Sequence, residues 1–198
     1  MDLGKLAGKL ARKIAFKFLS HEMRMKLRPA SKRRFLLEKM PKNSICAEIG
    51  VWDGDFSSQI LKTAKPKKLF LIDPWCKEYP YLEKKYQKVL DRFQSEIKNG
   101  TVVVYRSVSH DVIEKFDNDF FDWIYLDGGH TYDNLTEQFS DYFPKVKLHG
   151  FVTGDDYGRD DENHRKNVTR AVDVFISKEL TETVIIKNYQ FILKKVKS

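Results

Sequence analysis

The sequence predicts an α/β fold in which a mainly parallel sheet carries helices on both faces and ends in an antiparallel hairpin. From residue 45 onward, short apolar runs typical of strands alternate with amphipathic stretches typical of helices. This alternation predicts βαβ units, in which the strands are parallel. The chain has 198 residues, of which 41% are hydrophobic and 13% aromatic, so it is long enough and apolar enough for one domain with a full core.

Each element of the predicted fold corresponds to one stretch of sequence. Strands are expected at ICAEIG, KLFLID, TVVVYR, DWIYLD, GFVTGDD, ETVIIK and QFILKKV. Helices are expected at FSSQILKTA, from Tyr81 to Lys98, and at HDVIEKF, NLTEQFSDYFPKV and HRKNVTRAVDVFISKE. Only Asn-Tyr separates the last two strands, so these should form the hairpin.

Residues 1–44 are expected to form a basic helical arm, and residues 45–198 the domain itself. Apolar residues recur at helical spacing from Leu3 to Phe18, with lysines and Arg12 around them. Residues 1–42 hold 13 Lys and Arg against 3 Asp and Glu, whereas the remainder holds 23 against 25. The net charge of +8 therefore comes from the arm. Its open roles are a lid, a homo-oligomer contact, or a peripheral membrane contact through residues 1–20.

Several classes of protein do not fit the composition. The two cysteines, Cys46 and Cys76, form no CxxC pair, which argues against a disulfide framework or structural zinc and favours a reducing, cytoplasmic compartment. No stretch approaches the ~18 consecutive apolar residues of a membrane span. The first residues lack the apolar core and cleavage site of a signal peptide.

The ends of the first two expected strands predict a cofactor site. Glu48, Gly50 and Gly54 lie in the loop after the first strand, and Asp73 ends the second strand 25 residues after Glu48. Glycines let a ligand approach the backbone, and an acid at the end of the second strand can accept hydrogen bonds from ribose hydroxyls. A nucleoside-type cofactor is therefore expected. The alternative is ordinary turn chemistry, because Asp-Gly and Asp-Pro pairs are common in turns.

The ends of the fourth and fifth expected strands predict a metal site. Asp127 ends one strand, and Asp155 and Asp156 end the next, 28 residues later. Adjacent strands lie ~4.8 Å apart, so three carboxylates would gather and repel one another unless a cation joined them. Oxygen ligands favour Mg²⁺, with Mn²⁺ or Ca²⁺ as alternatives. The competing interpretation is that Asp155 or Asp156 only caps a turn.

His130 is the candidate catalytic base. It follows Asp127 after two glycines, which leave space for a bound molecule. The pKa of an imidazole lies near neutral pH, which suits proton abstraction. A packing or hydrogen-bonding role is the alternative.

The E-x-G-x-x-x-G pattern from Glu48 to Gly54 resembles motif I of the Rossmann-like class I methyltransferases that use S-adenosylmethionine (SAM). A nicotinamide site would instead carry G-x-G-x-x-G. The resemblance covers residues 45–196 and extends to seven strands with a closing hairpin. It implies SAM bound by the motif I loop and Asp73, with Ser107 near the adenine and Asp127 beside the cofactor.

The combination of DGGHTYDN, GDDYGRDD and NVTRAVDVF resembles a metal-dependent branch of these enzymes. That branch includes macrocin O-methyltransferase and the cephalosporin hydroxylase-like proteins. The resemblance implies that Asp127, Asp155 and Asp156 hold Mg²⁺ and that His130 serves as the base. Motif I departs from the usual pattern at Trp52 and Asp53, where small or polar residues are common.

The expected function is therefore SAM- and metal-dependent methylation of a hydroxyl group on a small molecule, and the resemblance implies a sugar or a glycosylated metabolite. One alternative is a relative that binds metal and SAM without methylating, as a hydroxylase-like or partner protein. The other is an RNA methyltransferase recruited by the basic arm. A nucleic-acid partner is not expected, because enzymes that methylate nucleic-acid amino groups carry (N/D)-P-P-(Y/F) where this chain has DGGH.

Overall fold

The computed structural model describes residues 31–129, 131–158 and 165–197. A boundary between Lys32 and Arg33 divides the chain into two units, and the fold described is that of the second, Arg33–Ser198. The amphipathic helix expected between Leu3 and Phe18 lies outside the described residues. The roles expected of the arm therefore stay predictions.

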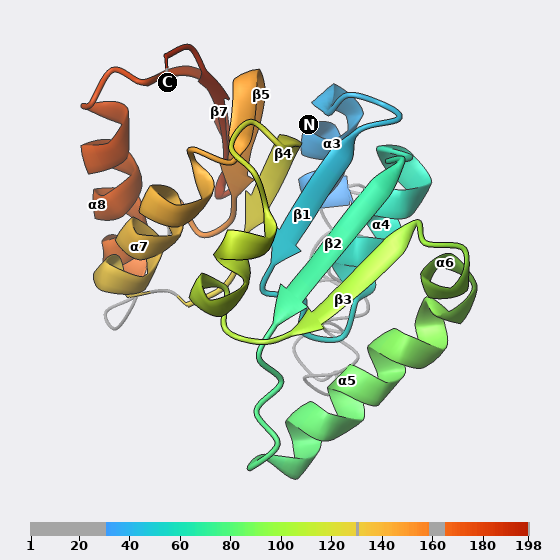
Figure 1. Ribbon diagram of the computed structural model, residues 1–198. Coiled ribbons are helices and arrows are strands. Elements are labelled where there is room, and N and C mark those ends of the chain that lie inside the picture. Colours follow the sequence, from blue (N-terminus) through green and yellow to red (C-terminus); the bar gives the residue numbers. More distant parts are fainter. Residues whose placement is uncertain (1–30, 130, 159–164, 198) are drawn as a thin grey trace, which may run out of the picture. The chain divides into compact units, whose positions relative to one another are not determined.

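The described residues contain one seven-stranded sheet in the order β3-β2-β1-β4-β5-β7-β6 (Figure 1). Neighbouring strands from β3 to β5 are parallel, whereas β7 runs antiparallel to both β5 and β6. The predicted sheet, with its closing hairpin, is confirmed. The strands are β1 (Ile45–Ile49), β2 (Lys68–Asp73), β3 (Val102–Arg106), β4 (Phe121–Leu126), β5 (Val146–Gly154), β6 (Thr181–Lys187) and β7 (Gln190–Lys195).

Helices cover both faces of the sheet, as predicted (Figure 1). One core contains Val112, Phe139 and Val172, from the 3-10 helix η1 and from α7 and α8. The other contains Leu37, Ile60 and Val89, from α3, α4 and α5. The helices are α3 (Ser31–Lys39), α4 (Asp55–Thr63), α5 (Pro80–Arg92), α6 (Gln94–Lys98), η1 (His110–Lys115), α7 (Tyr132–Tyr142) and α8 (Arg165–Ile176).

Helix α3 is part of the compact unit. Leu36 and Leu37 are fully buried and Met40 nearly so, in the same core as α4 and α5. The unit consequently begins at Arg33, ahead of the boundary that the change of pattern at residue 45 suggests. The two boundaries differ because the apolar side chains of α3 pack into the core, although the segment around them is strongly basic.

The long polar helix expected from Tyr81 to Lys98 is instead two helices. The break falls at Phe93, whose φ of −112° and ψ of 21° end α5 before α6 begins. Phe93 is buried, and its ring lies against Gly54 at the start of α4. The chain turns so that this aromatic side chain enters the core.

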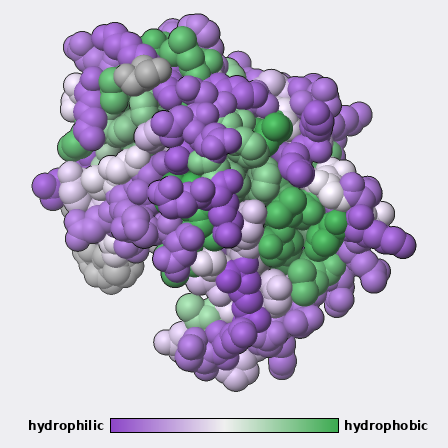
Figure 2. All heavy atoms as spheres, viewed as in Figure 1, coloured by the Kyte–Doolittle hydropathy of each residue, from purple (hydrophilic) through white to green (hydrophobic). Residues whose placement is uncertain are grey.

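The visible face in Figure 2 is largely hydrophilic, with a hydrophobic area over β2 and β3. Strand β3 is at the edge of the sheet, and Val103 and Tyr105 on it are only partly buried. Among the residues that the structure describes, no helix has the length and apolarity needed to cross a membrane.

Candidate functional site

The carboxyl ends of β1, β2, β4 and β5 meet at one edge of the sheet, where ligands bind in open parallel sheets. The loop after β1 approaches the loop after β4 very closely. Gly50 has a φ of +89°, and a Cβ atom built on it would lie 2.3 Å from the backbone oxygen of Asp127. Only glycine fits there, both because φ is positive and because backbone atoms occupy the space.

Asp73 ties the loop after β1 to the end of β2. Its Oδ2 accepts hydrogen bonds from the backbone N–H groups of Val51 (2.9 Å) and Trp52 (3.0 Å). Its Oδ1 accepts one from the backbone N–H of Trp75 (3.0 Å). Ser107 is adjacent, because its backbone N–H donates to the carbonyl oxygen of Asp73 (3.2 Å). The structure thus brings together the loop, Asp73 and Ser107, as the sequence predicts.

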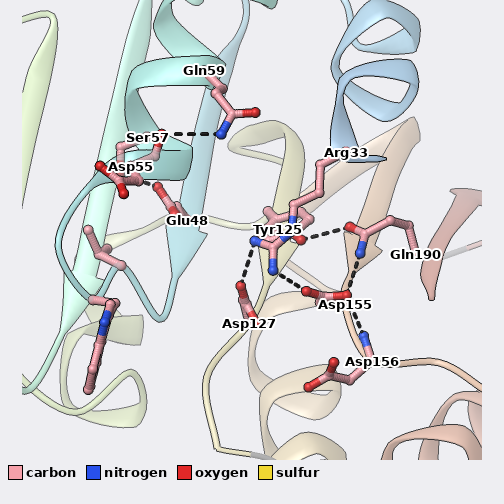
Figure 3. Close-up of polar contacts among 12 residues, drawn as sticks. Arg33, Glu48, Asp55, Ser57, Gln59, Tyr125, Asp127, Asp155, Asp156 and Gln190 are labelled. Atoms are coloured by element: carbon pink, nitrogen blue, oxygen red, sulfur yellow. Dashed lines mark hydrogen bonds and ion pairs between the residues drawn. The ribbon is translucent and has the colours of Figure 1, made fainter. Parts of the chain in front are cut away.

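Glu48 is buried beside the start of helix α4, next to Ser57 (Figure 3). Its side chain is 1% exposed and accepts a hydrogen bond from the Ser57 hydroxyl (2.5 Å). Burial raises the pKa of Glu48 to about 8, although the Ser57 hydrogen bond lowers it. We therefore expect Glu48 to position the start of α4 and to be without direct contact with a cofactor.

Trp52 adds an exposed aromatic ring beside the Asp73 loop. The ring is 48% exposed, and the Lys85 Nζ lies 4.0 Å from its centroid. Tyr81 is also exposed, with its ring centroid 6.3 Å from that of Trp52. The backbone oxygen of Trp52 accepts a hydrogen bond from the indole of buried Trp75 (2.7 Å), which fixes the loop.

The predicted carboxylates at the ends of β4 and β5 do gather, but around a guanidinium group (Figure 3). Arg33 Nη1 donates to Asp127 Oδ2 (2.8 Å), and Arg33 Nη2 donates to Asp155 Oδ2. The guanidinium carbon lies 5.0 Å from the Phe56 ring centroid and 5.6 Å from that of Tyr125. Arg33 reaches this place from the first turn of α3.

The second oxygen of Asp155 is also engaged. Asp155 Oδ1 accepts hydrogen bonds from the side-chain amide of Gln190 and from the backbone N–H of Asp156 (2.8 Å). Gln190 in turn accepts a hydrogen bond from the Tyr125 hydroxyl (2.7 Å). Residues of β4, β7 and the loop after β5 therefore hold Asp155 in one orientation toward Arg33.

Burial dominates the electrostatics of this cluster. It raises the pKa of Asp127 to about 7, against the lowering effect of Arg33, while Asp155 and Asp156 raise that pKa further. Burial lowers the pKa of Arg33, but Tyr125, Asp127 and Asp155 together raise it above its ordinary value. Arg33 accordingly stays charged and offsets part of the negative charge.

The described arrangement does not fit a divalent ion. Within the described ranges, no three His, Cys, Asp or Glu side chains are placed to share a metal. The facing oxygens of Asp127 and Asp155 accept hydrogen bonds from Arg33, and Asp156 adopts a left-handed φ of 68°. The predicted base, His130, lies outside the described residues.

Sequence reasoning missed Arg33 and Gln190. Arg33 stands in the run Lys32-Arg33-Arg34, where nothing distinguishes it from its neighbours. The apolar pair Leu36 and Leu37 was the one available indication that this segment packs on the domain. Gln190 begins the last strand of the hairpin, and no motif marks it.

Comparisons with known proteins agree with the fold. A family model described as a methyltransferase domain matches residues 47–157. No curated protein sequence matches the chain. The cofactor-bound structure of Rv0187 from MTB is similar, with a TM-score of 0.65 and 14% identity over 98% of this chain and 89% of that one.

Two similar structures are O-methyltransferases by name. NovP has a TM-score of 0.62 and 17% identity, covering 84% of this chain and 80% of NovP. TomG from Streptomyces achromogenes, in complex with SAM, has a TM-score of 0.57 and 14% identity, covering 84% of this chain and 76% of TomG. At these identities, the similarity shows a shared fold.

Proposed function

The chain belongs to the methyltransferase domain family, and we propose that it transfers the methyl group of SAM to a hydroxyl oxygen of a small molecule. It is a SAM-dependent methyltransferase by family and fold. The finer parts of the proposal are the hydroxyl acceptor, its chemical class and the residues that bind and activate the two substrates.

The observation that carries the proposal is the link between Asp73 and the loop after β1. Asp73 Oδ1 accepts one backbone hydrogen bond, so this carboxylate oxygen keeps a lone pair for a ribose hydroxyl. Gly50 leaves the edge of the sheet free of a side chain at the point where the two loops meet. We propose that SAM lies across this edge, with Ser107 near its adenine.

SAM supplies a methyl group on a cationic sulfur, which is already a good electrophile. The alcohol oxygen is the poorer partner, because it attacks well only after losing its proton. We propose His130 for this proton, since it follows Gly128 and Gly129 directly after the Asp127 loop. Holding the oxygen in line with the methyl group would supply much of the remaining rate.

A sugar hydroxyl is the acceptor class that we propose. It is supported by the resemblance of the segments at Asp127, Asp155 and Val168 to the macrocin O-methyltransferase branch. The O-methyltransferases NovP and TomG, of which TomG acts in tomaymycin synthesis, have the same fold. The part that TomG plays in tomaymycin synthesis supports a small-molecule acceptor.

The same resemblance calls for Mg²⁺ or Mn²⁺ at Asp127, Asp155 and Asp156. This part of the proposal meets an obstacle in the structure, because Arg33 uses the oxygens of Asp127 and Asp155 that a metal would need. A divalent ion would bind there only after Arg33 had left. The steps proposed above therefore assign no role to a metal.

The cofactor part is tested by titrating SAM into the protein with calorimetry. Asp73→Ala should weaken SAM binding at least tenfold, because the ribose loses its acceptor and the loop loses two backbone hydrogen bonds. Asp117→Ala, which changes an exposed aspartate away from the site, is the matched control and should bind as the unsubstituted chain does. Equal SAM affinity in all three proteins would show that Asp73 does not belong to the cofactor site.

The acceptor part is tested with radiolabelled SAM and a cell extract that is then separated into small-molecule, lipid and RNA fractions. Label in the small-molecule fraction, on oxygen, is the expected result. Label confined to RNA would overturn the proposed acceptor while leaving SAM binding intact.

A further inference from the structure

The guanidinium of Arg33 lies where the sequence pattern places a divalent ion, between carboxylates that end two adjacent parallel strands (Figure 3). We infer that Arg33 is the resident cation of this site and that a divalent ion and Arg33 exclude each other there. The inference rests on the proposed function only for the position of the cluster beside the methyl acceptor.

The hydrogen-bond geometry supports this exclusion. Arg33 gives one terminal nitrogen to Asp127 and the other to Asp155, so its planar fork bridges the two carboxylates. A Mg²⁺ ion would need oxygens of these same groups at about 2.1 Å. It would then lie against a fixed positive charge, so the two cations cannot share the site.

The surroundings of Arg33 form a binding site built for a guanidinium. Phe56 and Tyr125 place their rings within about 6 Å of its central carbon, a distance at which arginine is attracted to an aromatic ring. Gln190 and the backbone of Asp156 hold Asp155 in the orientation that meets Arg33. While Arg33 occupies Oδ2 and these two groups occupy Oδ1, Asp155 has little acceptor capacity left for a metal.

The neighbouring arginine shows that this arrangement is particular to Arg33. Arg34 pairs with Glu38 one turn along the same helix, and both side chains are more than half exposed. The Arg33 side chain is 25% exposed and that of Asp155 only 5%. An exposed pair such as Arg34 and Glu38 contributes little, whereas Arg33 offsets buried negative charge.

The charge balance predicts what removal of Arg33 would do. Arg33 carries one positive charge, whereas three acidic groups, Asp127, Asp155 and Asp156, interact electrostatically with one another there. Without the guanidinium, two carboxylates on adjacent strands would face each other with no cation between them. That is the donor set that attracts Mn²⁺ or Mg²⁺.

The test measures Mn²⁺ binding to the full chain by electron paramagnetic resonance of the free ion. Arg33→Met keeps the apolar stem against Phe56 and Tyr125 but removes the charge. We expect it to bind Mn²⁺ at least tenfold more tightly than the unsubstituted chain. Arg34→Met is the matched control and should bind as the unsubstituted chain does.

Equal Mn²⁺ affinity in the unsubstituted chain and Arg33→Met would overturn the inference, whether both bind tightly or neither binds. If Arg33→Met does not fold, Arg33→Lys serves instead, because a shorter side chain with a single ammonium nitrogen does not reproduce the two-nitrogen fork that the guanidinium gives to Asp127 and Asp155. It should bind Mn²⁺ at least threefold more tightly than the unsubstituted chain, and an unchanged affinity would again refute exclusion. SAM calorimetry on the same samples is independent, so failure of the cofactor proposal would be seen separately.

Discussion

Replacing Gly50 by alanine should destabilise the protein far more than the same change at Gly100. The two glycines have similar positive φ angles, +89° and +78°, so both substitutions force an L side chain into a left-handed conformation. That strain costs about 1–2 kcal/mol. The surroundings differ, because a Cβ at Gly50 would lie 2.3 Å from a backbone oxygen and 2.7 Å from a backbone nitrogen, whereas at Gly100 nothing lies within 4 Å.

The close contact at Gly50 adds an overpacking cost of about 1–3 kcal/mol, because backbone atoms cannot swing aside as a flexible side chain can. The total for Gly50→Ala is therefore about 2–5 kcal/mol, against about 1–2 kcal/mol for Gly100→Ala, and the two differ by the overpacking cost of about 1–3 kcal/mol. In a domain of this size, each kcal/mol lowers the melting temperature by about 2–4 °C.

Thermal unfolding followed by circular dichroism measures both variants, and calorimetry reports their SAM affinity. We expect Gly50→Ala to melt at least about 2 °C below Gly100→Ala, which follows from a difference of at least about 1 kcal/mol. We also expect it to bind SAM more weakly, because the loop after β1 is pushed outward. Equal melting temperatures for the two variants would refute the close approach of the β1 and β4 loops.

Two further predictions concern buried side chains. Burial raises the pKa of Glu48 to about 8 in the folded chain, above its ordinary value of 4.5, so its contribution to stability is present below pH 4.5 and is lost as the pH rises through about 8. In Glu48→Gln the free energy of unfolding, measured by urea unfolding at a series of pH values, should fall less between pH 4.5 and about 8 than in the unsubstituted chain. An unchanged pH dependence would exclude a neutral Glu48 at pH 7. Leu37→Ala, in the fully buried face of α3, should lower the free energy of unfolding by about 2–5 kcal/mol. A loss below about 0.5 kcal/mol, typical of surface changes, would place α3 outside the folded unit.

The parts of the site that follow from strand spacing could be predicted from the sequence. One βαβ repeat separates Asp127 from Asp155, and in the structure β4 and β5 are neighbours, with Leu126 opposite Gly154. The glycine loop and Asp73 likewise end adjacent strands. Such predictions succeed because the length of each βαβ repeat decides where the next strand ends, and this does not depend on how the side chains pack.

The direction of Glu48 could not be predicted in this way. Successive side chains on a strand point to opposite faces, so Glu48 shares a face with Cys46 and lies opposite Ala47 and Ile49. Both faces of β1 are buried, and the sequence therefore lacks the polar–apolar alternation that would tell them apart.

Arg33 could not be predicted for a different reason. It lies 94 residues from Asp127 and 122 from Asp155, in a segment whose lysines and arginines all look alike in the sequence. Its position depends on how α3 packs through Leu36 and Leu37, which is a property of the tertiary structure. The cation site at these carboxylates was expected from their spacing and charge and from the resemblance to the metal-dependent branch. Neither the spacing nor the charge says whether a metal or a side chain supplies the cation.

The order of synthesis on the ribosome determines when the Arg33 cluster can form. Arg33 is made 122 residues before Asp155, and Gln190, which orients Asp155, follows 35 residues later still. Domains fold as units as the chain emerges at about 5–20 residues per second. The Arg33 cluster is therefore completed only several seconds after α3 is made, when β4, β5 and β7 have all been synthesised. A nascent chain stalled before Gln190 would hold the loop after β1 and Asp73 and still lack the finished guanidinium site.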